Sequence, residues 1–126
     1  MSELFDIVTF DTNKVSAINN IPEVYTDIIS VTTPSRDAGT YVMGFSIQYT
    51  FDSTSTSAYL QFRIDGGPWY EYRREPKDNS DAIGIFYSFP KDLTAGVHTL
   101  EVQMRKETAA GILNVVFGDA WFQRVG

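Results

Sequence analysis

Hydrophobic and polar residues alternate along three segments of the chain. The longest comprises residues 41–51, where every second residue is apolar or aromatic. The same period of two recurs over residues 58–64 and 100–104. Successive side chains of a β-strand point to opposite faces of the sheet, so each segment is predicted to be a strand with one buried face.

Five further segments are weaker strand candidates because their alternation is shorter or interrupted. They comprise residues 4–9, 28–33, 69–73, 83–89 and 113–125. In the last of them, Gly118 and Asp119 predict a kink or bulge. Residues 12–21 contain spaced apolar side chains, but their asparagines and the following Pro22 favour a loop or a single helical turn.

Turn-forming residues lie between these segments. They cluster at residues 34–39, 52–57, 65–68, 76–81, 90–96 and 108–111. About eight short strands at this spacing predict an all-β fold, an antiparallel two-sheet sandwich of jelly-roll-like topology. Residues 1–25 are less regular and are predicted to be an N-terminal strand or an arm, whereas residues 26–126 form the β-sandwich domain of a single globular unit.

The composition agrees with one folded domain and argues against nucleic acid and membranes as partners. The chain has 126 residues, and 43% of them are hydrophobic. The formal charge is −6, with scattered basic residues, which argues against nucleic acid as a partner. No apolar run approaches the length of a membrane span, and residues 1–10 lack the basic start of a secretory signal.

Few residues are available for catalysis. The chain has no cysteine, which removes disulfides and thiol chemistry, and a single histidine, His98. A strong strand follows His98, so we interpret it as a polar residue at an outward strand position or a strand end. We therefore predict no enzyme activity, no catalytic residue and no cofactor.

Acidic residues are the most plentiful remaining candidates for chemistry. Several share one predicted loop with basic residues, namely Glu71, Arg73, Arg74, Glu75, Lys77, Asp78 and Asp81. Nearly equal numbers of both signs favour solvated ion pairs over the two opposed carboxylates of a glycosidase. Oxygen atoms of Asp78, Asn79, Ser80 and Asp81 could surround Ca²⁺, but their spacing matches no EF-hand loop, and no metal site is predicted.

Aromatic residues follow the turn at residues 66–68. Trp69, Tyr70 and Tyr72 are our candidates for an aromatic surface platform that stacks on sugars or anchors a protein interface. Alternation sends Trp69 to one face and both tyrosines to the other, so at least one of these groups is expected in the core. Of Trp121 and Phe122, one should likewise be buried and the other should face solvent or a partner.

Several short motifs resemble small virion proteins of tailed bacteriophages. They are AGTY at residues 38–41, IDGG at 64–67, EPKD at 75–78, LTAGVHTL at 93–100 and WFQRV at 121–125, so the resemblance extends over residues 38–126. The AGTY and LTAGVHTL motifs are also similar to carbohydrate-binding modules and to trimeric jelly-roll heads of the tumour-necrosis and complement type. The phage resemblance implies a decoration (cement) protein on the capsid or a fibre knob, oligomeric and often trimeric, without enzymatic activity.

Our leading hypothesis is therefore a capsid decoration protein that binds the outside of a phage head and stabilises it. Its partner would be the major capsid protein or another virion protein. It would form a homo-oligomer, with a trimer favoured, on the virion after synthesis in the host cytoplasm. The candidate contact comprises Leu4, Phe5, Ile7, Val8 and Phe10, because an unpaired β-prone segment can complete a neighbour's sheet.

The alternative hypothesis is a carbohydrate-binding or receptor-binding β-sandwich head domain of a fibre. In that case a glycan is the partner, and Trp69, Tyr70 and Tyr72 form the platform that it stacks on. A glycan hydrolase built on Glu71 and Glu75 is a third, less favoured possibility.

Overall fold

The computed structural model describes residues 10–53, 56–74 and 77–126, and side chains are described except at residues 10, 53 and 77–82. It contains eight strands, and the described residues form no helix and therefore no helical membrane span. The strands are β1 (Phe10–Ile18), β2 (Thr26–Thr32), β3 (Gly39–Ser53), β4 (Ala58–Ile64), β5 (Tyr70–Arg74), β6 (Lys77–Leu93), β7 (Thr99–Lys106) and β8 (Leu113–Arg124).

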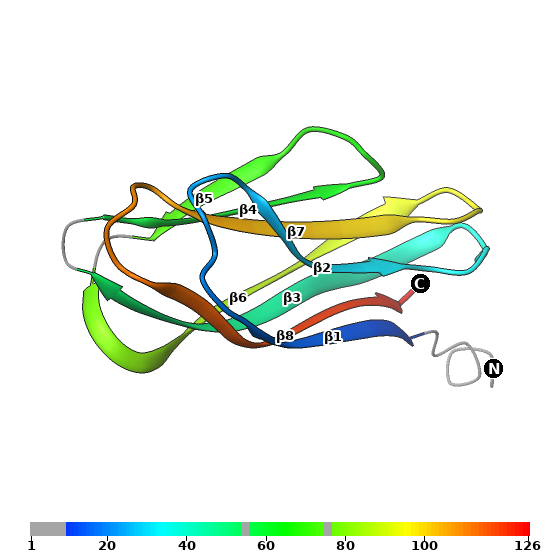
Figure 1. Ribbon diagram of the computed structural model, residues 1–126. Helices are drawn as coiled ribbons and strands as arrows, with labels where there is room; N and C mark the ends of the chain where they lie inside the picture. The colour runs from blue at the N-terminus through cyan, green and yellow to red at the C-terminus, as the bar shows by residue number, and fades with distance from the viewer. Residues whose placement is uncertain (1–9, 54–55, 75–76) are drawn as a thin grey trace.

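The strands form two four-stranded antiparallel sheets that lie face to face (Figure 1). Sheet A has the order β1-β8-β3-β6 and sheet B the order β2-β7-β4-β5. The chain crosses to the other sheet at every connection except the β4–β5 hairpin. This crossing pattern is that of an eight-stranded jelly roll, so the predicted all-β sandwich is confirmed.

The core is formed by the inner faces of the two sheets. The alternation along β3 is confirmed, because Tyr41, Met43, Phe45, Ile47, Tyr49 and Phe51 are all buried. Sheet B contributes, among others, Ala58 and Leu60 of β4 and Leu100, Val102 and Met104 of β7. These strands are central in their sheets, which explains why their hydrophobic pattern is the most regular in the chain.

Residues 12–18 are a strand, and the prediction of a loop or helical turn over residues 12–21 is wrong. Strand β1 pairs with β8 at the edge of sheet A. Its register passes from Ser16 to Ile18, and the skipped residue Ala17 has a positive φ of 50°. Val15 and Ile18 therefore both pack against the core at a spacing of three, which resembles a helical period.

A bulge in β8 lies opposite the same point. The register of β8 against β3 shifts between Val115 and Phe117. Inward positions change there from odd to even numbers, since Val115 is buried and Ala120 and Phe122 are buried beyond it. The predicted irregularity in this strand is real, but its position is Val116 and not Gly118-Asp119.

Two predicted turns are partly wrong because β6 is longer than its composition indicates. Residues 77–81 belong to β6, where Lys77, Asp78 and Asn79 pair with the end of β3. The strand also continues through Pro90, which pairs with Val42. Since β6 is the edge strand of sheet A, a proline without an N–H group is tolerated there.

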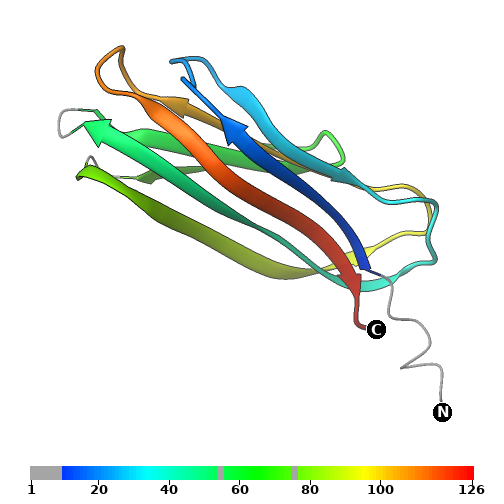
Figure 2. The same cartoon turned by 60° about the horizontal axis from the view of Figure 1, so that its bottom comes forward.

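The predicted strand over residues 4–9 lies outside the described residues. Strand β1 begins at Phe10, which pairs with Gln123 near the C-terminal end of β8. The start of β1 and the C-terminus therefore lie at the same end of the sandwich, as both views show (Figure 2).

Candidate functional site

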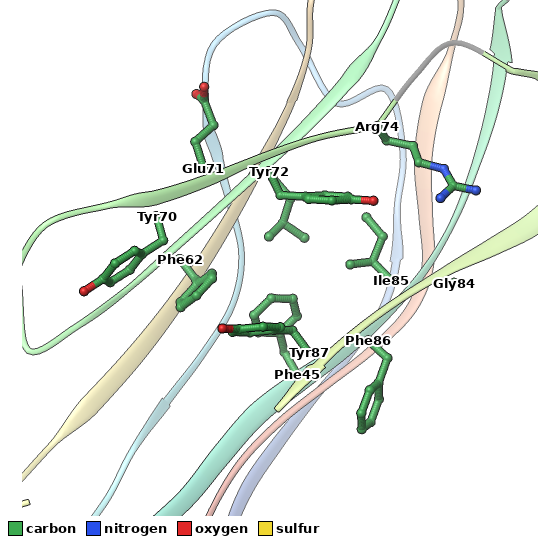
Figure 3. A pocket seen from close by; sticks show the side chains of 11 residues that line it. Phe45, Phe62, Tyr70, Glu71, Tyr72, Arg74, Gly84, Ile85, Phe86 and Tyr87 are labelled. Carbon is green, nitrogen blue, oxygen red and sulfur yellow. The ribbon is translucent and has the colours of Figure 1, made fainter. Parts of the chain in front are cut away.

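The sandwich is open along one side, between the short edge strand β5 and the long edge strand β6. None of the described strands closes this side, and a pocket of about 440 Å³ lies between the two sheets there (Figure 3). It is lined by Phe45, Leu60, Phe62, Tyr70, Glu71, Tyr72, Arg74, Gly84, Ile85, Phe86 and Tyr87. A smaller pocket of about 240 Å³ shares Phe62, Tyr70 and Tyr87 with it and extends to Phe89 and Lys91. We call the two pockets together the edge groove.

Strand register explains why tyrosines face the edge groove. Tyr72 lies opposite Leu60 on β4, and the buried side chain of Leu60 marks the inner face of sheet B. Tyr70 lies opposite Phe62, and Tyr87 of β6 lies opposite Phe45. Paired residues in a sheet share a face, so all three tyrosines point inward from an edge.

The Phe62 ring lies at the centre of the aromatic side chains that line the groove. Its ring centroid is 5.3 Å from those of Tyr70 and Tyr87 and 5.4 Å from that of Phe45. Because none of the described strands covers them, Tyr70, Tyr72 and Tyr87 remain 57%, 47% and 47% exposed. The groove thus presents tyrosine rings with free faces or edges on an apolar floor.

One end of the edge groove is polar. Arg74 lies opposite Ala58, whose buried side chain places Arg74 on the inner face of sheet B. The Tyr72 hydroxyl points toward the side of the pocket on which Arg74 and Ile85 lie (Figure 3). The nearby Tyr49 hydroxyl is buried and has no hydrogen-bond partner among the described residues. Burial raises its pKa to about 12, although the charge of Arg74 acts in the opposite direction.

Trp69 does not share a surface with the two tyrosines. Its ring packs on Arg63, whose guanidinium carbon is 4.3 Å from the ring centroid. Arg63 also forms an ion pair of 2.9 Å with Glu101. The expected separation of Trp69 from Tyr70 and Tyr72 is confirmed, but none of the three is fully buried, because β5 is an edge strand with little packed against it.

A second aromatic surface lies on the outer face of sheet A. Phe86 and Trp121 lie there with ring centroids 5.8 Å apart. Figure 3 shows the Phe86 side chain directed away from the pocket. Together with the exposed Phe117 of β8, these residues form what we call the outer patch. The prediction for the Trp121 and Phe122 pair is confirmed, since Phe122 is completely buried.

Trp121 lies across Gly44 of the neighbouring strand. A Cβ atom at Gly44 would be 2.9 Å from Cζ2 of Trp121 and would clash with the carbonyl oxygen of Tyr87. Phe86 and Tyr87 were not among the site residues predicted from the sequence. The available signal was the run from Ile85 to Phe89, in which consecutive aromatic residues indicate a strand with aromatic side chains on both faces.

Most of the predicted acidic loop belongs to strands β5 and β6. Glu71 is on β5 and accepts a hydrogen bond from the Tyr25 hydroxyl, and burial together with Glu71 raises the pKa of Tyr25. Residues 78–81 lie in the extended strand β6, and their side chains are outside the described part. No group of three metal-ligating side chains occurs among the residues that the structure describes.

His98 lies directly before β7, in agreement with the predicted strand end, but it is buried and does not point outward. Its Nδ1 lies 2.6 Å from Oδ2 of Asp65, and its Nε2 lies 2.7 Å from the carbonyl oxygen of Thr94. Burial lowers the pKa of His98, but these two hydrogen bonds raise it more, so it lies above the ordinary value of 6.5. The histidine thus ties the β4–β5 turn to the β6–β7 loop, which is a structural role.

Sequence comparison yields no family model that matches and no similar curated protein. Solved structures do share the fold. Eiger TNF from S. frugiperda is 10% identical, with a TM-score of 0.55 over 95% of this chain and 94% of that one. The mosquito-larvicidal Cry4Aa toxin from Bacillus thuringiensis is also 10% identical, with a TM-score of 0.51 over 91% of this chain.

The chain spans only 24% of that toxin. A carbohydrate-binding module of Cellvibrio mixtus lichenase 5A, solved with cellotriose, is 13% identical at a TM-score of 0.43, covering 90% of this chain and 96% of that one. At such identities the Eiger and Cry4Aa similarities define the class of fold and no activity. The chain is thus a β-sandwich protein with an aromatic groove at its open edge and a second aromatic surface on sheet A.

Proposed function

We propose that the protein is a non-enzymatic structural component of a tailed-phage particle, a capsid decoration protein that forms homo-oligomers. The observation that carries this proposal is the outer patch. The Phe86 ring is 69% exposed beside Trp121 on a sheet face. Aromatic residues that are exposed together on a flat surface are typical anchors of protein interfaces.

The surroundings of the outer patch also suit an interface. Ser46 and Ser88 lie beside it on β3 and β6, and Lys14 lies 3.9 Å from Asp119 on β1 and β8. Apolar anchors surrounded by small and charged polar residues are the usual anatomy of an interface core and rim. The partner in this proposal is a second copy, the major capsid protein or another virion protein on the exterior of the capsid.

The segment with Leu4, Phe5, Ile7, Val8 and Phe10 remains part of this proposal as a further contact. The side chains of these residues are outside the described part. What supports their role is the position of β1, which is the edge strand of sheet A. A segment that leaves from a sheet edge can add to the sheet of a neighbour.

The test compares Phe86→Ser with Val24→Ser, because Val24 is also 69% exposed but lies in the β1–β2 loop. Light scattering coupled to gel filtration gives the oligomeric state, and cosedimentation with purified phage heads gives attachment. We expect Phe86→Ser to become monomeric or to lose attachment at least tenfold, while Val24→Ser behaves as the wild type. Equal behaviour of all three proteins would refute the outer patch as the interface.

A carbohydrate-binding or receptor-binding head is the second candidate function, and the edge groove favours it. Tyrosine rings with accessible faces can stack on the apolar faces of sugars, and a pocket of about 440 Å³ lies within the usual range for ligand sites. Saturable glycan binding that is lost in Tyr72→Ala and kept in Trp69→Ala would support this candidate. Loss in Trp69→Ala alone would place the sugar on the outer face of sheet B instead.

A further inference from the structure

The polar end of the edge groove contains an arginine, Arg74, that has no partner within the described part of the chain. The other five arginines of the chain each have one. Their contacts are Arg36 with Asp11 at 2.8 Å, Arg63 with Glu101 at 2.9 Å, Arg73 with Glu107 at 3.8 Å, Arg124 with Asp37 at 4.0 Å and Arg105 over the Tyr59 ring at 4.2 Å. Arg74 forms no hydrogen bond or ion pair with any residue that the structure describes.

Arg74 also differs from the other arginines in its location, which is inside the edge groove. Arg74 is half-buried on the inner face of sheet B and lines the pocket beside Tyr72. Glu71 also borders the pocket, but its carboxylate points away from it (Figure 3) and accepts a hydrogen bond from the Tyr25 hydroxyl. A guanidinium against an apolar wall is incompletely solvated, so an anion that enters the pocket gains a charge-assisted interaction.

The rest of the pocket restricts what that anion can be attached to. Tyr70 and Tyr87 present rings over a floor of Phe45 and Phe62. Such rings select a ligand with apolar C–H faces, and the Tyr72 hydroxyl can exchange hydrogen bonds with ligand hydroxyls. A pyranose that carries a carboxylate combines these features in one ring.

We propose that the edge groove binds an acidic sugar, with the sugar ring on Tyr70, Tyr72 and Tyr87 and its carboxylate paired with Arg74. The planar fork of a guanidinium matches a carboxylate through two parallel hydrogen bonds. This inference rests on the second candidate function, since it names the class of glycan that the groove selects. The assembly role of the outer patch is independent of it.

The test measures the affinity of two disaccharides by isothermal titration calorimetry. One ends in glucuronate and the other, with the same linkage, ends in glucose. We expect the wild type to bind the acidic sugar at least tenfold more tightly, and Arg74→Gln to bind both equally. The matched control is Arg73→Gln. Arg73 is adjacent to Arg74 in the chain but lies on the opposite face of β5, where it donates a hydrogen bond to Ser57. The Arg73→Gln variant should therefore keep the preference for the acidic sugar.

Three other results of these titrations would each refute a different part of the proposal. If the wild type binds both sugars equally and Tyr72→Ala binds neither, the groove is a glycan site but its selection of acidic sugars is wrong. If the wild type binds neither sugar, the carbohydrate candidate and this inference both fail. If Arg74→Gln keeps the preference while folded, as judged by circular dichroism, the carboxylate does not pair with Arg74.

Discussion

The hydroxyl of Tyr49 is one of two buried side-chain groups, with Asp119, that lack a hydrogen-bond partner among the described residues. Leaving a buried polar group unsatisfied costs about 1–3 kcal/mol. We therefore predict that Tyr49→Phe raises the free energy of unfolding by about 1 kcal/mol in urea denaturation.

Tyr41→Phe is the matched control for that substitution. Tyr41 is equally buried on the same strand, but its hydroxyl donates a hydrogen bond of 2.9 Å to the carbonyl oxygen of Asp37. Removing this hydroxyl should lower the free energy of unfolding by about 1 kcal/mol. A loss of stability of the same size in both variants would mean that Tyr49 has a partner.

His98 gives the molecule a pH dependence of stability. Both of its ring nitrogens face acceptor oxygens, so the doubly protonated form suits the site. Because its folded-state pKa is raised above the unfolded value of 6.5, His98 stabilises the fold fully below that pH, and the stabilisation is lost as the pH rises through the folded-state pKa.

Urea denaturation of the wild type and of His98→Gln at a series of pH values from about 5 to 9 measures this effect. The difference in unfolding free energy between the two proteins should be largest at the acidic end and should shrink above pH 6.5. A constant difference would show that His98 does not change its protonation with folding.

For the candidate site residues, the sequence predicts which face of a strand each side chain occupies but not what surrounds that face. Alternation correctly separated Trp69 from Tyr70 and Tyr72, since it follows from strand geometry. It could not show that the inner face of β5 borders an open groove, because that depends on the absence of a neighbouring strand. The inward position of His98 likewise depends on Asp65, which is distant in sequence.

At the scale of the element, the contact between β3 and β6 depends on a small residue at position 44. An alanine there would press on the Tyr87 carbonyl and on Trp121. We predict that Gly44→Ala lowers the free energy of unfolding by about 1–3 kcal/mol, as in other overpacked sites. Thermal and urea denaturation both measure this loss.

Gly84→Ala is the control, because a Cβ atom there would meet nothing within 4 Å. Its effect should be neutral or slightly stabilising, since alanine loses less backbone entropy than glycine on folding. If both alanine variants are equally stable, Trp121 has moved away from Gly44 at little cost.

The strands that the sequence identified best, β3, β4 and β7, are three of the four central ones, and the alternation of the fourth, β8, is interrupted by its bulge. Each of those three is paired on both sides and buries one face, which produces a regular alternation. Edge strands β1 and β6 were misjudged because pairing on one side tolerates polar residues. The residues at 77–79 form a strand only because the end of β3 lies beside them, a contact that no local pattern contains.

At the scale of the whole molecule, the edge groove and the outer patch meet at β6, because Phe86 borders the groove. Its side chain nevertheless points away from the pocket, whereas the ring of Tyr87 points into it (Figure 3), so the two sites use opposite faces of the same strand. We predict that Tyr72→Ala removes sugar binding without changing the oligomeric state, and that Phe86→Ser has the opposite effect. A calorimetric titration and a light-scattering measurement on each variant check this independence.

The class of fold was predictable from the number and spacing of the strands, whereas the order of the strands in each sheet was not. Pairs such as β1 with β8 join opposite ends of the chain, and nothing in a local window encodes them. Which side of the sandwich stays open follows from that order, so the groove could be located only in three dimensions.

Trp69 and Trp121 are the chain's two tryptophans, and the contacts described above place one against each sheet. Replacing Trp69 with phenylalanine leaves a single tryptophan, which can be excited at wavelengths that the seven tyrosines do not absorb and whose indole borders Phe86. Its emission maximum and its quenching by iodide then report, without any attached dye, when water is displaced from that face. The molecule thus contains its own optical probe for following assembly in real time.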